Sequence, residues 1–177
     1  VVIDDQFMTD LDNKEPRAMK LWGEILKTRL ETGEPYLMFE DNINNANPEA
    51  YKKNNLHVSM TNICSEIALY TDELHSFICC LSSLNLARWD EWKDYKFENG
   101  MTLPELTCWF LEGVLQEFID RGKNMRFMEN TIRSATKGRA IGIGVLGWHT
   151  LLQSKELPFV GIQASSLTRI ISKFIQE

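Results

Sequence analysis

The sequence lacks the short paired cysteine spacings that are typical of structural zinc sites and of small disulfide-linked proteins. Its four cysteines are Cys64, Cys79, Cys80 and Cys108. With 177 residues, the chain is too long to depend on disulfides for its stability. We therefore expect reduced thiols, no bound metal and a cytoplasmic protein. The alternative is a zinc site whose ligands come from Cys64, Cys79, Cys108 and either His57 or His75.

Long apolar runs and blocks of like charge are also absent. No apolar run approaches the ~20 residues needed to cross a bilayer, so no membrane partner is expected. The net charge of -6 and the pI near 5.2 argue against direct binding to nucleic acid. The first residues, Val1 to Asp5, contain neither an initiator methionine nor a signal peptide. We expect the chain to be a piece of a longer protein.

Apolar periodicity and capping residues predict several helices. Residues 16–32 are amphipathic and are followed by Gly33, and residues 102–121 begin with a capping threonine and end before Gly122. Cys108 lies in this second helix, and its side chain is expected to be buried in the protein core. Further helices are predicted over 88–96, 127–136, 146–153 and 163–176. Strands are predicted over 36–39, 58–67, 76–81 and 140–145, and a loop over 41–48.

The segment Gly142–Gly147 matches the G-x-G-x-x-G pattern of dinucleotide-binding proteins. That pattern indicates a nucleotide site only between a strand and a helix, with an acidic residue about 20 positions further on. Here the glycines fall inside the predicted strand, and residues 164–167 are Ala-Ser-Ser-Leu. We interpret the glycines as positions where the strand bends or packs closely against another backbone.

The segment Thr61–Ile67 carries the candidate chemistry. In an extended conformation Asn62, Cys64 and Glu66 share one face, about 6–7 Å apart, and Ile63 and Ile67 face the opposite way into packing. An amide, a thiol and a carboxylate on one face supply a hydrogen-bonding group, a reactive sulfur and a base. The alternative is that Cys64 is a small buried apolar residue.

A second pair of thiols follows in the predicted strand at 76–81. Cys79 and Cys80 are neighbours, so on a strand their side chains point to opposite faces. At most one of them faces a site built by Cys64. The alternative is that both are buried for packing.

Four segments resemble one family, in the same order along the chain. The sequence is similar to the large, catalytic (alpha) subunit of class I ribonucleotide reductase over most of residues 15–177. The matching segments are Leu30–Tyr36 with Asp41 and Asn42, Asn62–Ile67, Cys79–Leu86 and Arg139–Gly147.

The resemblance implies that residues 1–177 form part of the catalytic domain, which in this family is a ten-stranded α/β barrel with a central finger loop. It implies that the protein is an oxidoreductase that reduces ribonucleoside diphosphates for DNA precursor synthesis. Cys64 would form a thiyl radical, Glu66 would be the base and Asn62 would hold it, while Cys79 would be half of a redox-active dithiol. The implied substrate-binding residues are Asn62, Ile63, Cys64, Ser65 and Glu66. Cys80 would face away from the site.

Other parts of the family's large subunit have no counterpart in this sequence. They include the allosteric N-terminal domain, the second reducing cysteine and the C-terminal redox tail. The resemblance implies no cofactor in this chain. It implies a radical from a metal-containing small subunit, an external dithiol such as thioredoxin or glutaredoxin, and a complementary fragment of the large subunit. The alternative is a non-catalytic remnant or binding module that assembles with a reductase.

Overall fold

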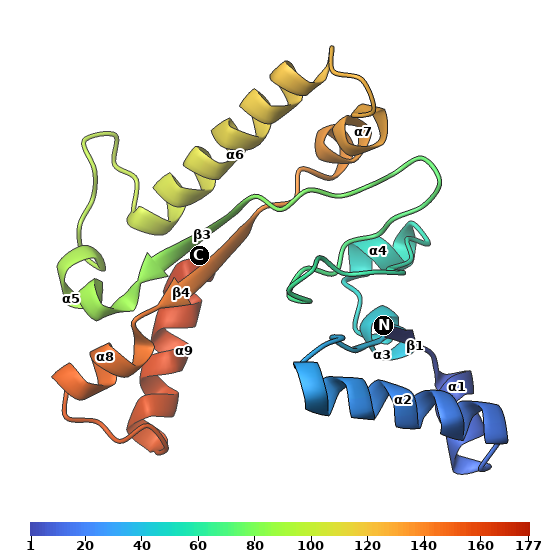
Figure 1. Cartoon of the computed structure of the whole chain (residues 1–177). Helices are drawn as coiled ribbons and strands as arrows, with labels where there is room; N and C mark the ends of the chain where they lie inside the picture. Colours follow the sequence, from blue (N-terminus) through green and yellow to red (C-terminus); the bar gives the residue numbers. More distant parts are fainter. The chain divides into compact units, whose positions relative to one another are not determined.

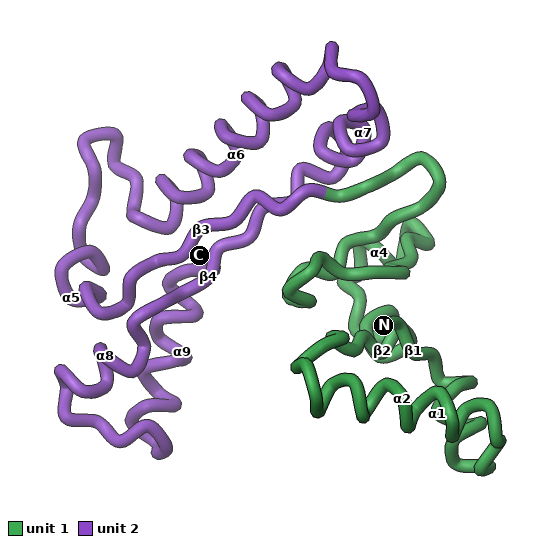
Figure 2. Tube along the Cα trace, viewed as in Figure 1, with its two compact units in different colours: residues 1–77 green, residues 78–177 purple.

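The computed structural model describes residues 1–177 and divides them into two compact units. Unit 1 is Val1–Phe77 and unit 2 is Ile78–Glu177 (Figure 2). Each unit combines helices with one pair of parallel strands (Figure 1). None of the helices is both long enough and apolar enough to cross a membrane.

Unit 1 begins with a short strand pair and two helices. Strand β1 (Val2–Ile3) pairs in parallel with β2 (Met38–Phe39), and the helices between them are α1 (Asp5–Asp12) and α2 (Pro16–Thr32). The predicted bounds of α2 are confirmed. Gly33 ends the helix in the left-handed conformation, φ 79°, and its N–H donates to Arg29 O.

The rest of unit 1 corrects two predictions. The predicted strand at 36–39 has only two paired residues, of which Met38 is buried and Phe39 is exposed. The predicted loop at 41–48 contains α3 (Glu40–Asn45) and is followed by α4 (Glu49–Lys53). Asparagine usually disfavours helices because its side chain competes for nearby backbone groups. In α3, the Asn44 amide instead bonds the backbone of Val58, so a tertiary contact outweighs local propensity.

Unit 2 is built on β3 (Leu81–Asn85), which runs parallel to β4 (Gly142–Leu146), with Leu81 opposite Gly142 and Asn85 opposite Leu146. The other elements are the 3-10 turn η1 (Leu86–Arg88) and helices α5 (Trp89–Trp92), α6 (Leu103–Gly122), α7 (Glu129–Gly138), α8 (Trp148–Ser154) and α9 (Ile162–Gln176). The prediction of a strand at 76–81 is therefore displaced, because the strand begins only at Leu81 and continues to Asn85. Strand β4 is only partly covered, because Val145 and Leu146 are half exposed.

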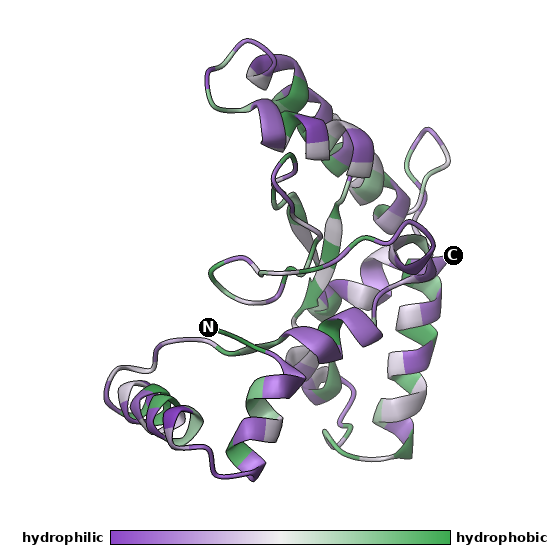
Figure 3. Ribbon diagram, turned by 90° about the vertical axis from the view of Figure 1, so that its right-hand side faces the viewer, coloured by the Kyte–Doolittle hydropathy of each residue, from purple (hydrophilic) through white to green (hydrophobic).

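Two apolar clusters hold unit 2 together. One joins η1 and α5 to α8 and α9 through Leu84, Leu86, Trp89, Trp92, Leu151 and Ile171. The other joins α6 and α7 to the start of the strand pair through Cys80, Leu111, Leu115, Ile119 and Ala135. Ile143 of β4 packs against both clusters. Figure 3 shows apolar and polar residues side by side along α9, the helix that ends at the C-terminus.

Helix α6 begins as predicted but buries a narrower face than expected. The Thr102 N–H donates to Glu105 Oε2 at 2.7 Å, and a reciprocal bond completes the capping box. The prediction that Cys108 lies in the core is wrong, because its side chain is exposed. Trp109 and Phe110 are also more than half exposed, since the strands and α7 cover only the stripe that includes Leu111 and Leu115.

The glycine motif is structural, as its position in the sequence predicts. In β4 a Cβ on Gly142 would lie 2.7 Å from Leu81 Cδ2, so the end of the Leu81 side chain occupies the space beside this glycine. Gly147 follows the strand and precedes α8, with φ 76°. A Cβ on Gly147 would lie 2.8 Å from Asn85 Oδ1 and 2.9 Å from Ala87 N.

Gly147→Ala is expected to lower the free energy of unfolding by about 2–5 kcal/mol. The left-handed backbone costs a residue with a Cβ roughly 1–2 kcal/mol, and overpacking adds roughly 1–3 kcal/mol. Denaturant unfolding followed by circular dichroism measures the change. The matched control is Gly113→Ala in the exposed middle of α6, where an added Cβ meets nothing within 4 Å. Equal effects of the two substitutions would contradict the close packing at Gly147.

Candidate functional site

The segment around Cys64 forms a tight turn and not the predicted strand. The Asn62 N–H donates to Ile67 O at 3.2 Å, and the Ser65 N–H donates to Asn62 O at 3.1 Å. Ser65 adopts φ 68°, a left-handed conformation that lets the chain reverse. The predicted alternation of faces therefore does not apply here, and the turn itself sets where these side chains point. We call Asn62–Ile67 the finger turn.

Two of the predicted site residues meet directly across the finger turn. The Asn62 Nδ2 donates to Glu66 Oε1 at 2.6 Å, and the Asn62 Oδ1 accepts from the Ile67 N–H at 3.0 Å. One amide side chain thus closes the turn and holds the carboxylate. This contact restricts the rotamers of the Glu66 side chain.

The tip of the finger turn is exposed. Cys64 is an exposed thiol, so the alternative of a small buried apolar residue is wrong. Ile63 is 91% exposed, and the prediction that it faces into packing is also wrong. A turn of this kind has no interior for its tip residues to pack into. The finger turn therefore combines an exposed sulfur with a carboxylate that Asn62 holds two residues later in the sequence.

Cys79 and Cys80 differ in burial, although they precede β3 and do not lie on the predicted strand. Cys80 is buried, and its Sγ lies 3.4 Å from Leu111 O, to which it donates. Cys79 is exposed. Both belong to unit 2, whereas Cys64, Asn62 and Glu66 belong to unit 1. The pairing of Cys79 with a second thiol stays a prediction.

Burial, together with the nearby Glu112 carboxylate, raises the pKa of the Cys80 thiol. A raised pKa keeps Cys80 protonated at a pH where ordinary thiols are partly ionised, and only the thiolate reacts readily. We expect iodoacetamide at pH 8.5 to modify Cys79 at least about tenfold faster than Cys80. Peptide mapping by mass spectrometry measures both rates in one peptide, so Cys79 serves as the internal control. Equal rates at the two positions would contradict the buried placement of Cys80.

The zinc alternative receives no support from the geometry. No group of three or more His, Cys, Asp or Glu side chains is arranged to hold a metal ion. Both candidate histidines contact carboxylates instead. His57 Nε2 lies 2.6 Å from Glu40 Oε1, and His75 Nδ1 lies 2.8 Å from Asp72 Oδ1.

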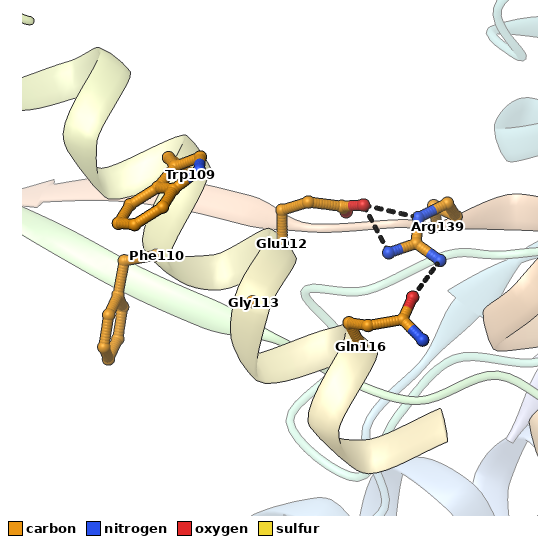
Figure 4. A pocket seen from close by; sticks show the side chains of 6 residues that line it. All are labelled: Trp109, Phe110, Glu112, Gly113, Gln116 and Arg139. Carbon is orange, nitrogen blue, oxygen red and sulfur yellow. Dashed lines mark hydrogen bonds and ion pairs between the residues drawn. The ribbon is translucent and has the colours of Figure 1, made fainter. Parts of the chain in front are cut away.

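A hollow on the surface of unit 2 contains an ion pair that the sequence does not predict. Arg139 adopts the left-handed conformation just after α7, φ 45°, and its Nε donates to Glu112 Oε1 at 2.6 Å. Its Nη1 also donates to Gln116 Oε1 at 3.1 Å. Figure 4 shows Glu112 and Gln116 pointing toward Arg139, while Trp109 and Phe110 lie to the other side. These contacts tie the end of α7 to α6.

Sequence reasoning also missed Asn44, which lies in the segment predicted to be a loop. The side chain of Asn44 bonds both backbone groups of Val58, close to the start of the finger turn. Its neighbourhood is rich in asparagine, and that composition indicated only a loop. A bond between residues 14 positions apart has no local signal in a single sequence.

Comparisons with known proteins agree on one family. Residues 5–177 match the family model described as "Ribonucleotide reductase, barrel domain". The chain is 39% identical over 160 residues to the putative ribonucleoside-diphosphate reductase large subunit of Frog virus 3, covering 90% of this chain and 27% of that protein. It is 40% identical over 159 residues to the corresponding large subunit of Invertebrate iridescent virus 3, covering 90% of this chain and 24% of that protein.

A solved structure gives the same result. The Actinobacillus ureae class Id ribonucleotide reductase alpha subunit is similar with a TM-score of 0.85 and 40% identity, over 99% of this chain and 33% of that one. The chain therefore spans about a quarter to a third of the length of these relatives. The match confirms the predicted fold class, an α/β chain that forms part of the reductase barrel.

Proposed function

Because this chain belongs to the ribonucleotide reductase family through its barrel domain, we propose that it forms part of the catalytic region of a ribonucleoside-diphosphate reductase large subunit. The enzyme reduces ribonucleotides to 2′-deoxyribonucleotides, the precursors of DNA. The finger turn is the observation that supports this proposal most strongly. It presents the exposed Cys64 thiol two residues before Glu66, whose carboxylate is held at 2.6 Å by Asn62.

In the proposed reaction, the Cys64 thiyl radical takes the hydrogen atom from C3′ of the ribose and becomes a thiol. Glu66 accepts the proton of the 3′ hydroxyl, a role that requires an ionised carboxylate within hydrogen-bond reach. Asn62 keeps that carboxylate in place. The turn contacts the substrate through the exposed Ile63 and the half-buried Ser65 among its residues.

The C2′–O bond then breaks, and the 2′ hydroxyl leaves as water. A dithiol supplies the two electrons and two hydrogens that the reduction needs and becomes a disulfide. We assign Cys79 to this dithiol because it matches the reducing cysteine of the family motif and is exposed. The hydrogen held by Cys64 returns to C3′ and restores the thiyl radical, so the only net oxidation is that of the dithiol.

The proposed partners follow from this chemistry. A metal-containing small subunit generates the radical, and thioredoxin or glutaredoxin reduces the disulfide. The complementary part of the large subunit supplies the second reducing thiol and the remaining substrate contacts. We place the reaction in the cytoplasm, where dithiol reductants keep cysteines reduced.

The test uses the full-length large subunit with its small subunit and a dithiol reductant. We expect conversion of a ribonucleoside diphosphate to its deoxy product only when both the small subunit and the reductant are present. Omitting either one provides the matched control. A full-length subunit that assembles with the small subunit but forms no deoxynucleotide would contradict the proposal and favour a non-catalytic module.

A further inference from the structure

The side chain of Asn44 bonds both the carbonyl and the N–H of Val58. Its Nδ2 donates to Val58 O at 2.8 Å, and its Oδ1 accepts from the Val58 N–H at 2.9 Å. Val58 is fully buried, so these backbone groups have no water to bond to. Asn44 thereby fixes the chain four residues before Asn62, where the finger turn begins.

The remaining bonding capacity of the Asn44 amide is used by Glu40 in its own helix and by Asn47 just after that helix. The Nδ2 also donates to Glu40 O at 2.9 Å, and the Oδ1 also accepts from Asn47 Nδ2 at 3.0 Å. A primary amide has two donor hydrogens and two acceptor lone pairs, and all four are engaged here. Aspartate would lose both donors, and leucine would lose all four bonds. The position therefore requires an amide of this length.

Two further contacts extend the support from Val58 toward Cys64. The Ser59 Oγ and Thr71 Oγ1 lie 3.0 Å apart, which joins the two arms of the loop. The Asn62 N–H to Ile67 O bond closes the turn itself. The chain segments before and after Cys64 are therefore linked at two places, by the Ser59–Thr71 contact and by the Asn62–Ile67 bond. These contacts connect the Val58 backbone to the finger turn that carries Cys64.

We propose that Asn44 is a positioning residue for Cys64. It contacts no reacting atom, and it acts by holding the Val58 backbone and thus the base of the loop that carries the thiol. This proposal rests on the function assigned above for its effect on turnover. Misplacement of a reacting group by about 1 Å can lower a rate by about 10²-fold. The loss should therefore appear mainly in kcat.

The test replaces Asn44 by alanine in the full-length enzyme. We expect kcat to fall about 10–100-fold, with a smaller change in KM. Asn44→Asp keeps acceptors for the Val58 N–H but loses the donors, so its loss of kcat should be smaller. The matched control is Asn54→Ala, because Asn54 Nδ2 donates only to Ala50 O in its own helix, at 2.8 Å.

Hydrogen exchange separates positioning from simple destabilisation and does not depend on turnover. We expect Asn44→Ala to speed exchange over residues 58–67, while α6 keeps its protection. If the wild-type enzyme proves inactive, this measurement still tests whether Asn44 holds the loop. Unchanged exchange over 58–67, or a loss of kcat no larger than that of Asn54→Ala, would overturn the inference. If Asn44→Ala does not fold, the same comparison with Asn44→Asp decides.

Discussion

In the full-length enzyme, Cys64→Ser is expected to lower turnover at least about a thousandfold, which corresponds to about 4 kcal/mol of transition-state stabilisation. Serine has nearly the same size, and no side-chain bond of Cys64 holds the finger turn together. The O–H bond of an alcohol is much stronger than the S–H bond of a thiol. Serine at position 64 is therefore not oxidised to a radical that takes hydrogen from the ribose.

The control for this variant is Cys108→Ser, which removes an exposed thiol from α6 in unit 2. It should retain full turnover. Assembly with the small subunit should be intact in both variants. Loss of turnover in Cys64→Ser alone supports the enzyme, whereas unchanged turnover in that variant would support a remnant that serves only as a binding module.

Glu66→Gln is expected to lower kcat by about 10²–10⁴-fold, the usual contribution of a general base. Glutamine keeps an oxygen that can accept the hydrogen bond from Asn62 Nδ2, so the shape of the finger turn should survive. Only the ability to accept the 3′ hydroxyl proton is lost. Steady-state kinetics on the full-length enzyme measures the change.

A shorter carboxylate provides the comparison. Glu66→Asp keeps the base but withdraws it by one methylene, so its kcat should lie between those of the wild type and Glu66→Gln. Hydrogen exchange at Asn62 and Ile67 should be the same in Glu66→Gln as in the wild type. A Glu66→Gln enzyme with unchanged kcat would show that Glu66 is not the base.

The elements that the sequence predicts well carry their signals locally. Helix α2 has a proline in its first turn and Gly33 at its end, and α6 has a capping threonine with a glutamate three residues later. Each of these features acts through bonds within one helical turn. The starts of both helices and the end of α2 therefore follow from the residues themselves, whereas α6 extends through Gly122, where its end was predicted.

The finger turn and α3 depend on contacts that are distant in sequence or specific in geometry. The left-handed Ser65 and the Asn62 to Ile67 bonds replace the predicted strand, although the alternating pattern fits an extended chain equally well. Helix α3 is bonded to Val58, which lies 14 residues after Asn44. Periodicity does not contain that information.

The sequence indicated the candidate site residues but not the turn that arranges them. The motif containing Asn62, Cys64 and Glu66 identified the residues, while the bond from Asn62 to Glu66 comes from the turn. Alternation of side chains did not indicate which of Cys79 and Cys80 is buried, and only the packing against α6 shows that it is Cys80. The exposure of Cys108 was not predicted either, because the width of the covered stripe on α6 depends on what packs against it.

Transfer of the C3′ hydrogen tests the role of Cys64 most directly. Single-turnover reduction of a ribonucleotide carrying deuterium at C3′ can be compared between the wild-type enzyme and Cys64→Ser. We expect a primary isotope effect with the wild type and no breaking of the C3′–H bond with the variant. Isotope-sensitive turnover that persists in Cys64→Ser would contradict this role of Cys64.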